Sequence, residues 1–263
     1  MLVLTFHRVE APTGLEITRV GPRRFARLVT ILRDTGLQVA AVGSDPLADG
    51  ADVVLTFDDG FASAAENALP VIREQGWTAI VFLIAGAIGK DDDWDVRILG
   101  RKRSMMTWAQ AREWSQAGIE FGSHTVTHAD LTALSSRALE RELAESRQRI
   151  SDELGAPVRY LAYPFGRHHE RVRAAAREAG YAAAFASDAT LDTGDDRFAI
   201  SRVTVHGLMT LFQYRRLLAQ AVDASSRSWF GRARTRLFTS LSAGSAIATD
   251  LRRIATQTVA GTR

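Results

Sequence analysis

Two acidic residues and two histidines have the types and spacing of a metal site. Asp58 and Asp59 are adjacent and directly follow an apolar run, while His124 and His128 are four residues apart just after another apolar run. One turn of chain can aim two histidines with this spacing at the same point, and a carboxylate from a neighbouring strand end completes a His₂Asp set. Three such ligands with an open water position are typical of catalytic zinc. The chain has no cysteine, so a metal can be bound only through His, Asp or Glu.

Short β-branched runs alternate with amphipathic helical patterns along most of the chain. This alternation favours a mostly parallel sheet covered by helices, and seven or eight such units before residue 222 predict a distorted α/β barrel of the (β/α)7-8 type. The expected strands are 2–6, 37–42, 52–57, 78–84, 119–123, 159–163, 181–186 and 200–205. The expected helices are 22–35, 62–75, 107–117, 135–154, 168–179 and 208–221.

Several polar residues that could do chemistry follow the expected strands. In a β/α barrel the loops at the carboxyl ends of the strands form the functional face, so we expect these residues to gather there. They are His7, Asp58, Asp59, His124, His128, Tyr163, Asp188 and His206. The polar segment 86–105 is expected either to wall this face or to be a solvated connection.

The net charge of +3 is unevenly distributed along the chain. Residues 222–263 contain seven Arg and two Asp, which leaves 26 basic and 28 acidic residues in 1–221. We expect 1–221 to form the barrel domain and 222–263 an Arg-rich C-terminal tail that is helical. Apolar residues interleaved with Arg are typical of a helix that packs on the barrel, or of a basic amphipathic helix on an anionic membrane surface. The slightly acidic barrel and the lack of a nucleic-acid-binding motif argue against a specific nucleic acid partner.

The sequence shows no pattern of a targeting signal. The opening apolar run Met1–Phe6 is too short for a signal-peptide core. No run approaches the roughly 18 to 20 apolar residues that span a bilayer. We therefore expect a cytoplasmic protein, with peripheral membrane contact through the tail.

Three motifs within 1–221 resemble those of the polysaccharide deacetylases, the NodB-homology group called carbohydrate esterase family 4. They are Leu55–Gly60, Gly122–Leu131 and Ala162–Gly166. The resemblance implies a carbohydrate N-deacetylase, a hydrolase that uses a divalent metal to remove N-acetyl groups from amino sugars. Zinc is the expected metal, and other divalent transition metals are the alternatives.

The resemblance also implies roles for the residues of the first two motifs. Asp59, His124 and His128 would bind the metal. Asp58 would act as the general base toward the attacking water. Hydrolysis of an amide also needs an electrophile for the carbonyl oxygen and an acid for the amine leaving group.

The third motif would contribute to substrate binding. The main-chain N–H near Phe165 would help to stabilise the oxyanion, and the side chains of Tyr163 and Phe165 would help to line the sugar pocket. The motif consists of Tyr163, Pro164, Phe165 and Gly166.

The general acid of the family comes from a late Leu-x-x-His motif, and no good copy follows residue 166. The matching string is Leu4-Thr5-Phe6-His7 at the front of the chain. A closed barrel has no first strand, so a circular permutation can move a terminal strand in sequence without moving it in the ring. We therefore assign His7 as the acid, with His206 as the competing assignment. This arrangement resembles the permuted branch of deacetylases that act on poly-N-acetylglucosamine-type exopolysaccharides.

The sequence departs from the family pattern at two points. Many members carry Arg where this chain has Ala162, and either Arg202 or Arg8 could replace that guanidinium in orienting Asp58. The usual fourth motif is absent, and Asp188 is a weak substitute.

Three functions remain open at this point. The first is removal of N-acetyl groups from a polysaccharide, an oligosaccharide or a lipid-linked glycan. The second is another amide hydrolysis, such as removal of a formyl group from a lipid-linked amino sugar. The third is a catalytically silent sugar-binding module with a structural metal, which would not need both Asp58 and Asp59.

Overall fold

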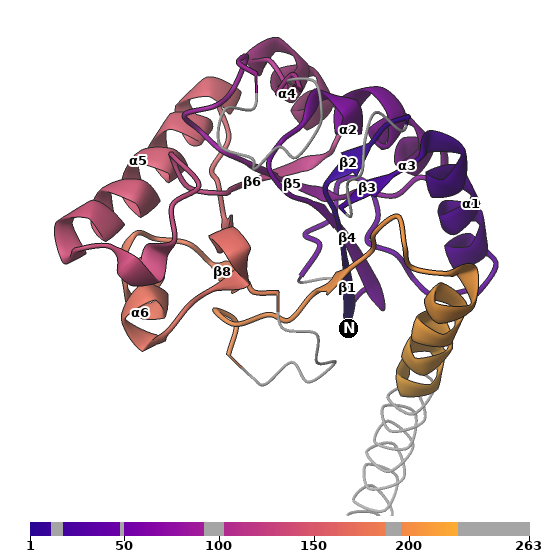
Figure 1. Ribbon diagram of the computed structural model, residues 1–263. Helices are drawn as coiled ribbons and strands as arrows, with labels where there is room; N and C mark the ends of the chain where they lie inside the picture. The colour runs from indigo at the N-terminus through magenta and orange to yellow at the C-terminus, as the bar shows by residue number, and fades with distance from the viewer. Residues whose placement is uncertain (12–17, 48–49, 92–102, 188–195, 226–263) are drawn as a thin grey trace, which may run out of the picture. The chain divides into compact units, whose positions relative to one another are not determined.

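Seven parallel strands form one sheet in the computed structural model (Figure 1), which describes residues 1–11, 18–47, 50–91, 103–187 and 196–225. In spatial order the strands are β8-β7-β6-β5-β4-β1-β9. Their bounds are β1 (Leu2–Phe6), β4 (Val53–Phe57), β5 (Ile80–Leu83), β6 (Glu120–Ser123), β7 (Tyr160–Ala162), β8 (Ala183–Phe185) and β9 (Val203–Thr204). All of them belong to Met1–Ala219, the first of two compact units, and the second unit is Gln220–Arg263.

Residues 200–205 connect the two sides of the curled sheet. Ile200 forms a parallel bridge with Phe185 of β8, and shortly afterwards β9 pairs with β1. Every residue of β1 and β4 is buried, as expected for parallel strands that are covered on both faces. The distorted α/β barrel predicted from the sequence is thus confirmed, with β1 inside the ring between β4 and β9.

The segment 37–42, expected to be a strand, is not one in the structure. It makes only isolated bridges, one to Val53 and one to Trp77, because the chain turns at Ser44. Two further short strands pair with each other outside the main sheet, and they are too short to have a recognisable sequence pattern: β2 (Arg8–Val9) and β3 (Arg19–Val20).

Helices lie around the outside of the sheet (Figure 1). They are α1 (Pro22–Arg33), α2 (Ala62–Asn67), α3 (Leu69–Glu74), α4 (Trp108–Gln116), α5 (Ser136–Leu154) and α6 (Glu170–Glu178), and residues 211–225 are also helical. The expected helix 62–75 is divided at Ala68, because Pro70 has no N–H to donate and its ring would crowd the preceding turn. None of the helices in the described ranges combines the length and the apolar character needed to cross a membrane.

Alternate residues of the strands pack in two directions. Phe6 and Phe57 pack against Phe25 of α1, with ring centroids 5.1 and 6.0 Å from that of Phe25. Residues of the other register, including Phe82 and Phe185, form a separate buried cluster. The ring centroids of Phe82 and Phe185 lie 5.3 Å apart, and the guanidinium of the buried Arg202 packs over both rings.

Gly122 leaves room for one of these rings. It pairs with Phe82 across β5 and β6, and a Cβ atom at this position would lie 2.6 Å from two ring carbons of Phe82 and 2.9 Å from the main-chain oxygen of Tyr160. We therefore expect Gly122→Ala to lower the free energy of unfolding by about 1–3 kcal/mol, measured by urea denaturation. Gly21→Ala is the matched control, because no atom lies within 4 Å of the added methyl group. Equal stabilities of the two variants would contradict this account of the packing.

Candidate metal centre and active site

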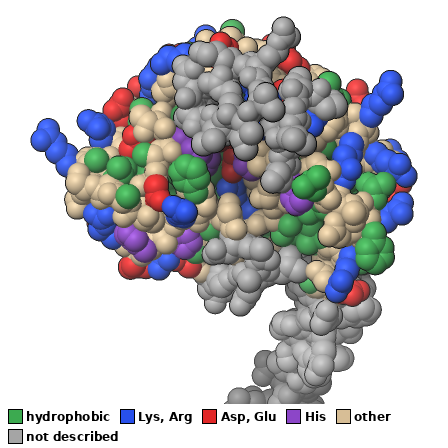
Figure 2. Space-filling model, in the orientation of Figure 1, with side chains coloured by type: hydrophobic (Ala, Val, Ile, Leu, Met, Phe, Trp, Pro, Cys, Tyr) green, Lys and Arg blue, Asp and Glu red, His purple; other side chains and the backbone are tan. Residues whose placement is uncertain are grey.

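The candidate functional residues gather at the carboxyl end of the sheet. Asp58 and Asp59 follow β4, and His124 follows β6. Because parallel strands all end at the same edge, residues far apart in the sequence meet there. Figure 2 shows a hollow at this place, with acidic, basic and histidine side chains visible inside it.

Asp59, His124 and His128 form a compact set of ligand atoms. One ligand atom from each residue lies within 4.8 Å of the others. Oδ1 of Asp59 is 3.5 Å from Nε2 of His124 and 3.6 Å from Nε2 of His128. Ligands about 2 Å from a tetrahedral ion lie roughly 3.4 Å from one another, so the spacing and the donor types fit a divalent metal such as zinc.

The hydrogen bonding of His124 prepares it to be a ligand. Its Nδ1 lies 2.8 Å from the carbonyl oxygen of Ala162, which can only accept, so Nδ1 carries the proton and Nε2 presents its lone pair. Burial lowers the pKa of His124 to about 3, so the ring is neutral at neutral pH. A metal ligand needs this protonation state.

Backbone strain is concentrated at this site. Among the described residues, the only non-glycine residues with positive φ are Asp59, Thr125, His128 and Phe165, with φ of 71°, 69°, 60° and 58°. This left-handed conformation is uncommon for residues with a side chain and is found disproportionately at functional sites. Thr125 helps to hold the turn between the histidines, since its Oγ1 accepts a hydrogen bond of 3.1 Å from the N–H of His128.

Asp58 is held by an arginine from the other end of the chain. Arg202 donates from both terminal nitrogens to the two carboxylate oxygens, at 2.7 and 2.9 Å, and both side chains are almost fully buried. Burial alone would raise the pKa of Asp58, but the positive charge of Arg202, aided by His124 and His7, lowers it to about 2. The carboxyl group is therefore ionised at neutral pH.

Of the two arginines that the sequence offered for this position, Arg202 makes the contact. Arg8 is also buried, but its guanidinium lies over the ring of Phe61, 5.2 Å from the centroid, and donates to Thr18. The residue that orients Asp58, which the sequence left undecided, is thus Arg202, just before β9.

The two candidate acids lie at neighbouring strand ends. His7 follows β1, and its charge is one of those that lower the pKa of Asp58. His206 follows β9, and its carbonyl oxygen accepts a hydrogen bond from the N–H of Met209. The electrostatic interaction between His7 and Asp58 links His7 to the acidic pair.

The third motif forms a tight turn beside the histidines. The ring of Phe165 is 61% exposed and packs edge-on against His128, 4.7 Å between centroids. Tyr163 is fully buried, and its hydroxyl donates to the carbonyl oxygen of Phe198 at 2.9 Å. Tyr163 therefore supports the turn from beneath and does not line the surface, contrary to the expectation. Pro164 is buried within the turn, and Gly166 approaches Ser187 so closely that no side chain would fit.

Glu142 is a structural contributor that sequence reasoning missed. Its carboxylate, on α5, accepts hydrogen bonds from the N–H groups of Val126 and Thr127 at 2.8 and 3.0 Å, and from the Thr127 hydroxyl at 2.7 Å. These two residues lie between the metal-ligand candidates His124 and His128. The signal in the sequence was a glutamate inside the apolar stripe of a helix, where burial requires a polar partner.

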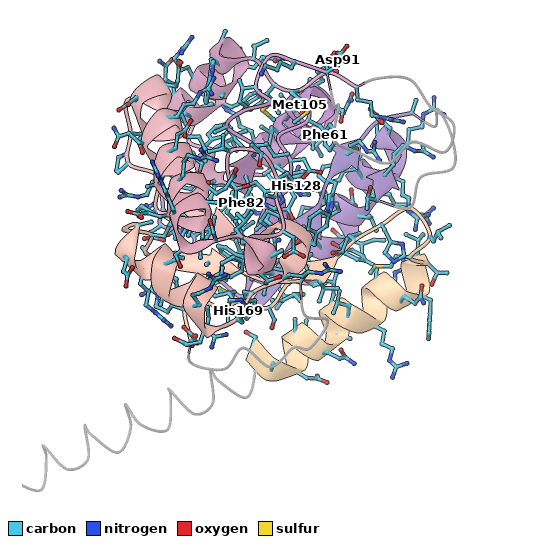
Figure 3. The ribbon with its side chains drawn as sticks, turned by 60° about the vertical axis from the view of Figure 1, so that its left-hand side comes forward. Phe61, Phe82, Asp91, Met105, His128 and His169 are labelled. Carbon is cyan, nitrogen blue, oxygen red and sulfur yellow. The ribbon has the colours of Figure 1, made fainter. Side chains whose placement is uncertain are left out.

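Part of the expected site lies outside the described residues. This holds for Asp188 and for 92–102, the middle of the polar segment 86–105. The described ends of that segment are joined by a hydrogen bond from the N–H of Met105 to the carbonyl of Lys90. Met105 packs with Phe61, and both are labelled in Figure 3.

Comparison with known proteins agrees with this geometry. The sequence model of the polysaccharide deacetylases matches residues 48–184, more than half of the chain. The Bacillus subtilis protein YxkH, whose name assigns it to the polysaccharide deacetylases, is 27% identical over 213 residues, which are 77% of this chain and 70% of YxkH. A chitooligosaccharide deacetylase of Sinorhizobium fredii is 32% identical over 133 residues, 50% of this chain and 54% of that protein.

A solved structure shows the same fold. The Streptococcus pyogenes deacetylase PplD in complex with acetate superimposes with a TM-score of 0.69 at 20% identity, covering 84% of this chain and 97% of that chain. The match of the family model, which includes the Asp58–Asp59 pair and both histidines, decides the assignment. The chain belongs to the polysaccharide deacetylase family.

Proposed function

We propose that the protein is a metal-dependent hydrolase that removes N-acetyl groups from amino sugars of a polysaccharide, an oligosaccharide or a lipid-linked glycan. The observation that carries this proposal is the close ligand set of Asp59, His124 and His128 beside Asp58, a buried and ionised carboxylate. A site that only holds a metal for stability has no use for this second carboxylate. The proposal is supported by the deacetylases among the relatives.

The metal would be held by Asp59, His124 and His128, with zinc as the expected ion. When bound, a divalent metal supplies Lewis-acid activation, which lowers the pKa of a coordinated water and polarises the acetyl carbonyl. Glu142 acts indirectly, because it fixes the turn that carries the two histidines.

The protein's own residues would handle the protons. Asp58 accepts a proton from the attacking water as the water oxygen bonds to the carbonyl carbon. Arg202 fixes the carboxylate through both of its oxygens and leaves each a free lone pair. The main-chain N–H near Phe165 donates to the oxyanion, and His7 gives a proton to the nitrogen as the C–N bond breaks. The products are acetate and a free amino sugar.

We further propose that the chain is circularly permuted relative to most of its family. His7 would take the role of a histidine that is late in other members, and the place of β1 between β4 and β9 supports this. The substrate class proposed for this permuted arrangement is a poly-N-acetylglucosamine-type glycan.

The ligand assignment predicts the metal content of the purified protein. Wild-type protein should contain about one divalent ion per chain by elemental analysis, as expected for a single His₂Asp site. The double substitution His124→Ala and His128→Ala should lose the ion and release no acetate. The matched control, His168→Ala with His169→Ala, should keep both, and Figure 3 shows His169 at the periphery, away from His128. Normal metal content in the first double variant would reject the ligand set.

The role of Asp58 predicts a separation between metal binding and turnover. Asp58→Asn should keep the metal and the fold but lower kcat by about 10²- to 10⁴-fold, because the amide is a poor base. The assay is acetate release from N-acetylglucosamine oligomers, run alongside formate release from the N-formyl analogue. Undiminished kcat would remove Asp58 from the mechanism, and preferential formate release would favour the deformylase alternative.

The role of His7 predicts different effects on two substrates. His7→Ala should impair hydrolysis of the N-acetyl amide far more than hydrolysis of 4-nitrophenyl acetate, whose leaving group needs little protonation. His206→Ala, measured in parallel, should impair both substrates equally or neither. If His206→Ala instead impairs the amide far more than the ester, and His7→Ala does not, His206 is the acid.

A further inference from the structure

Two large apolar side chains are exposed just beyond the last strand of the barrel. Leu208, which is 70% exposed, lies in the turn before the helix 211–225, and Phe212, which is 75% exposed, lies four residues later in the first turn of that helix. The neighbouring residues Tyr214 and Leu218 of the same helix are buried, so the helix presents one apolar side to the barrel and leaves Phe212 in solvent. Burial of Phe212 would remove a large hydrophobic area from water.

Exposed arginines surround these two residues. Arg215 and Arg216 are one turn beyond Phe212 on the same helix, and α1 contributes Arg23 and Arg27. The N-terminal half of α1 is joined to this region because Arg24 donates a hydrogen bond to the carbonyl oxygen of Met209. Figure 2 shows basic and hydrophobic side chains intermixed along the corresponding edge.

The charge of this region is mainly positive. None of Arg23, Arg27, Arg215 and Arg216 forms an ion pair with another residue in the described ranges. The sequence contains no Asp or Glu in α1 or between residues 197 and 222. Four exposed guanidinium groups that form no ion pair within the described part of the chain attract an anionic surface, and the exposed apolar side chains of Leu208 and Phe212 can enter its apolar layer.

We propose that Leu208, Phe212, Arg23, Arg27, Arg215 and Arg216 form a docking patch for the anionic surface of a phospholipid membrane. The combination of arginines with Leu and Phe favours a lipid surface over a free anion, which would have no use for exposed apolar side chains. This patch belongs to the barrel and is distinct from the Arg-rich segment 222–263.

The position of the patch connects it with the active site. β9 runs parallel to β1 and β4, so residues that follow β9 lie at the same edge of the sheet as His7 and Asp58. Docking through this edge would present the catalytic face to amino sugars at the membrane surface. This last step rests on the proposed function and favours a lipid-linked or membrane-associated glycan as the substrate, whereas docking itself does not depend on the activity.

Vesicle sedimentation of the full chain tests the patch. Wild-type protein should bind vesicles of phosphatidylcholine with phosphatidylglycerol, lose this binding in high salt, and bind vesicles of phosphatidylcholine alone much more weakly. Leu208→Ser with Phe212→Ser should weaken binding at least about tenfold. Arg215→Gln with Arg216→Gln should weaken it by about 30-fold, from roughly 1 kcal/mol for each charge.

Matched controls use exposed residues elsewhere in the barrel. Val42→Ser removes an exposed apolar side chain, and Arg141→Gln with Arg149→Gln removes two exposed charges from α5, so both controls should bind vesicles like the wild type. All variants should keep the metal and release acetate normally from a water-soluble oligomer, which separates failure of docking from failure of the proposed function.

Three outcomes would overturn the proposal. The first is that wild-type protein does not bind the anionic vesicles at low salt. The second is that the patch variants bind as well as the wild type, which would assign binding to another part of the chain. The third is that the wild type self-associates, does not bind vesicles, and loses self-association in the Leu208 and Phe212 double variant, which would make the patch an interface between copies.

Discussion

The buried ion pair between Asp58 and Arg202 is the interaction on which both the barrel and its chemistry depend. Arg202 lies just before β9 and also donates to the carbonyl oxygen of Ala186, so it links the last strand to β4 and to the segment after β8. Leaving one partner of such a pair buried alone costs about 3–5 kcal/mol. Because the folded-state pKa of Asp58 is lowered from 3.8 to about 2, its stabilising contribution is complete above pH 3.8 and is lost as the pH falls through about 2.

The site keeps His124 neutral and Asp58 ionised, and the physical cause is different for each. Burial disfavours the charged form of both His124 and Asp58, and for His124 it prevails, so the ring stays neutral. For Asp58 the guanidinium of Arg202 outweighs burial, so the carboxylate stays charged. A neutral imidazole and an anionic carboxylate side by side are the states that metal ligation and proton abstraction require.

Strand-end chemistry was predictable from sequence, whereas long-range partners were not. The apolar runs located all seven strands of the sheet and the carboxyl edge on which Asp58, Asp59 and His124 meet, because burial on both faces leaves a strong local pattern. Nothing local distinguishes Arg202 from Arg8, since each lies within two residues of a strand of the main sheet and both are buried. The segment 37–42 has strand composition but turns too soon to form a ladder, and the inward position of the Tyr163 ring depends on its contact with Phe198.

The sequence separation of the ion pair has a consequence for how the protein is made. Asp58 and Arg202 are 144 residues apart, so a chain emerging from the ribosome presents β4 long before its cation is available. Until residues 200–205 arrive, β1 and β8 are open sheet edges with unpaired backbone groups, which invite pairing with other chains. The nascent protein therefore passes through an unclosed stage in which neither the ring nor the catalytic carboxylate is complete, and chaperone demand should be greatest in that interval.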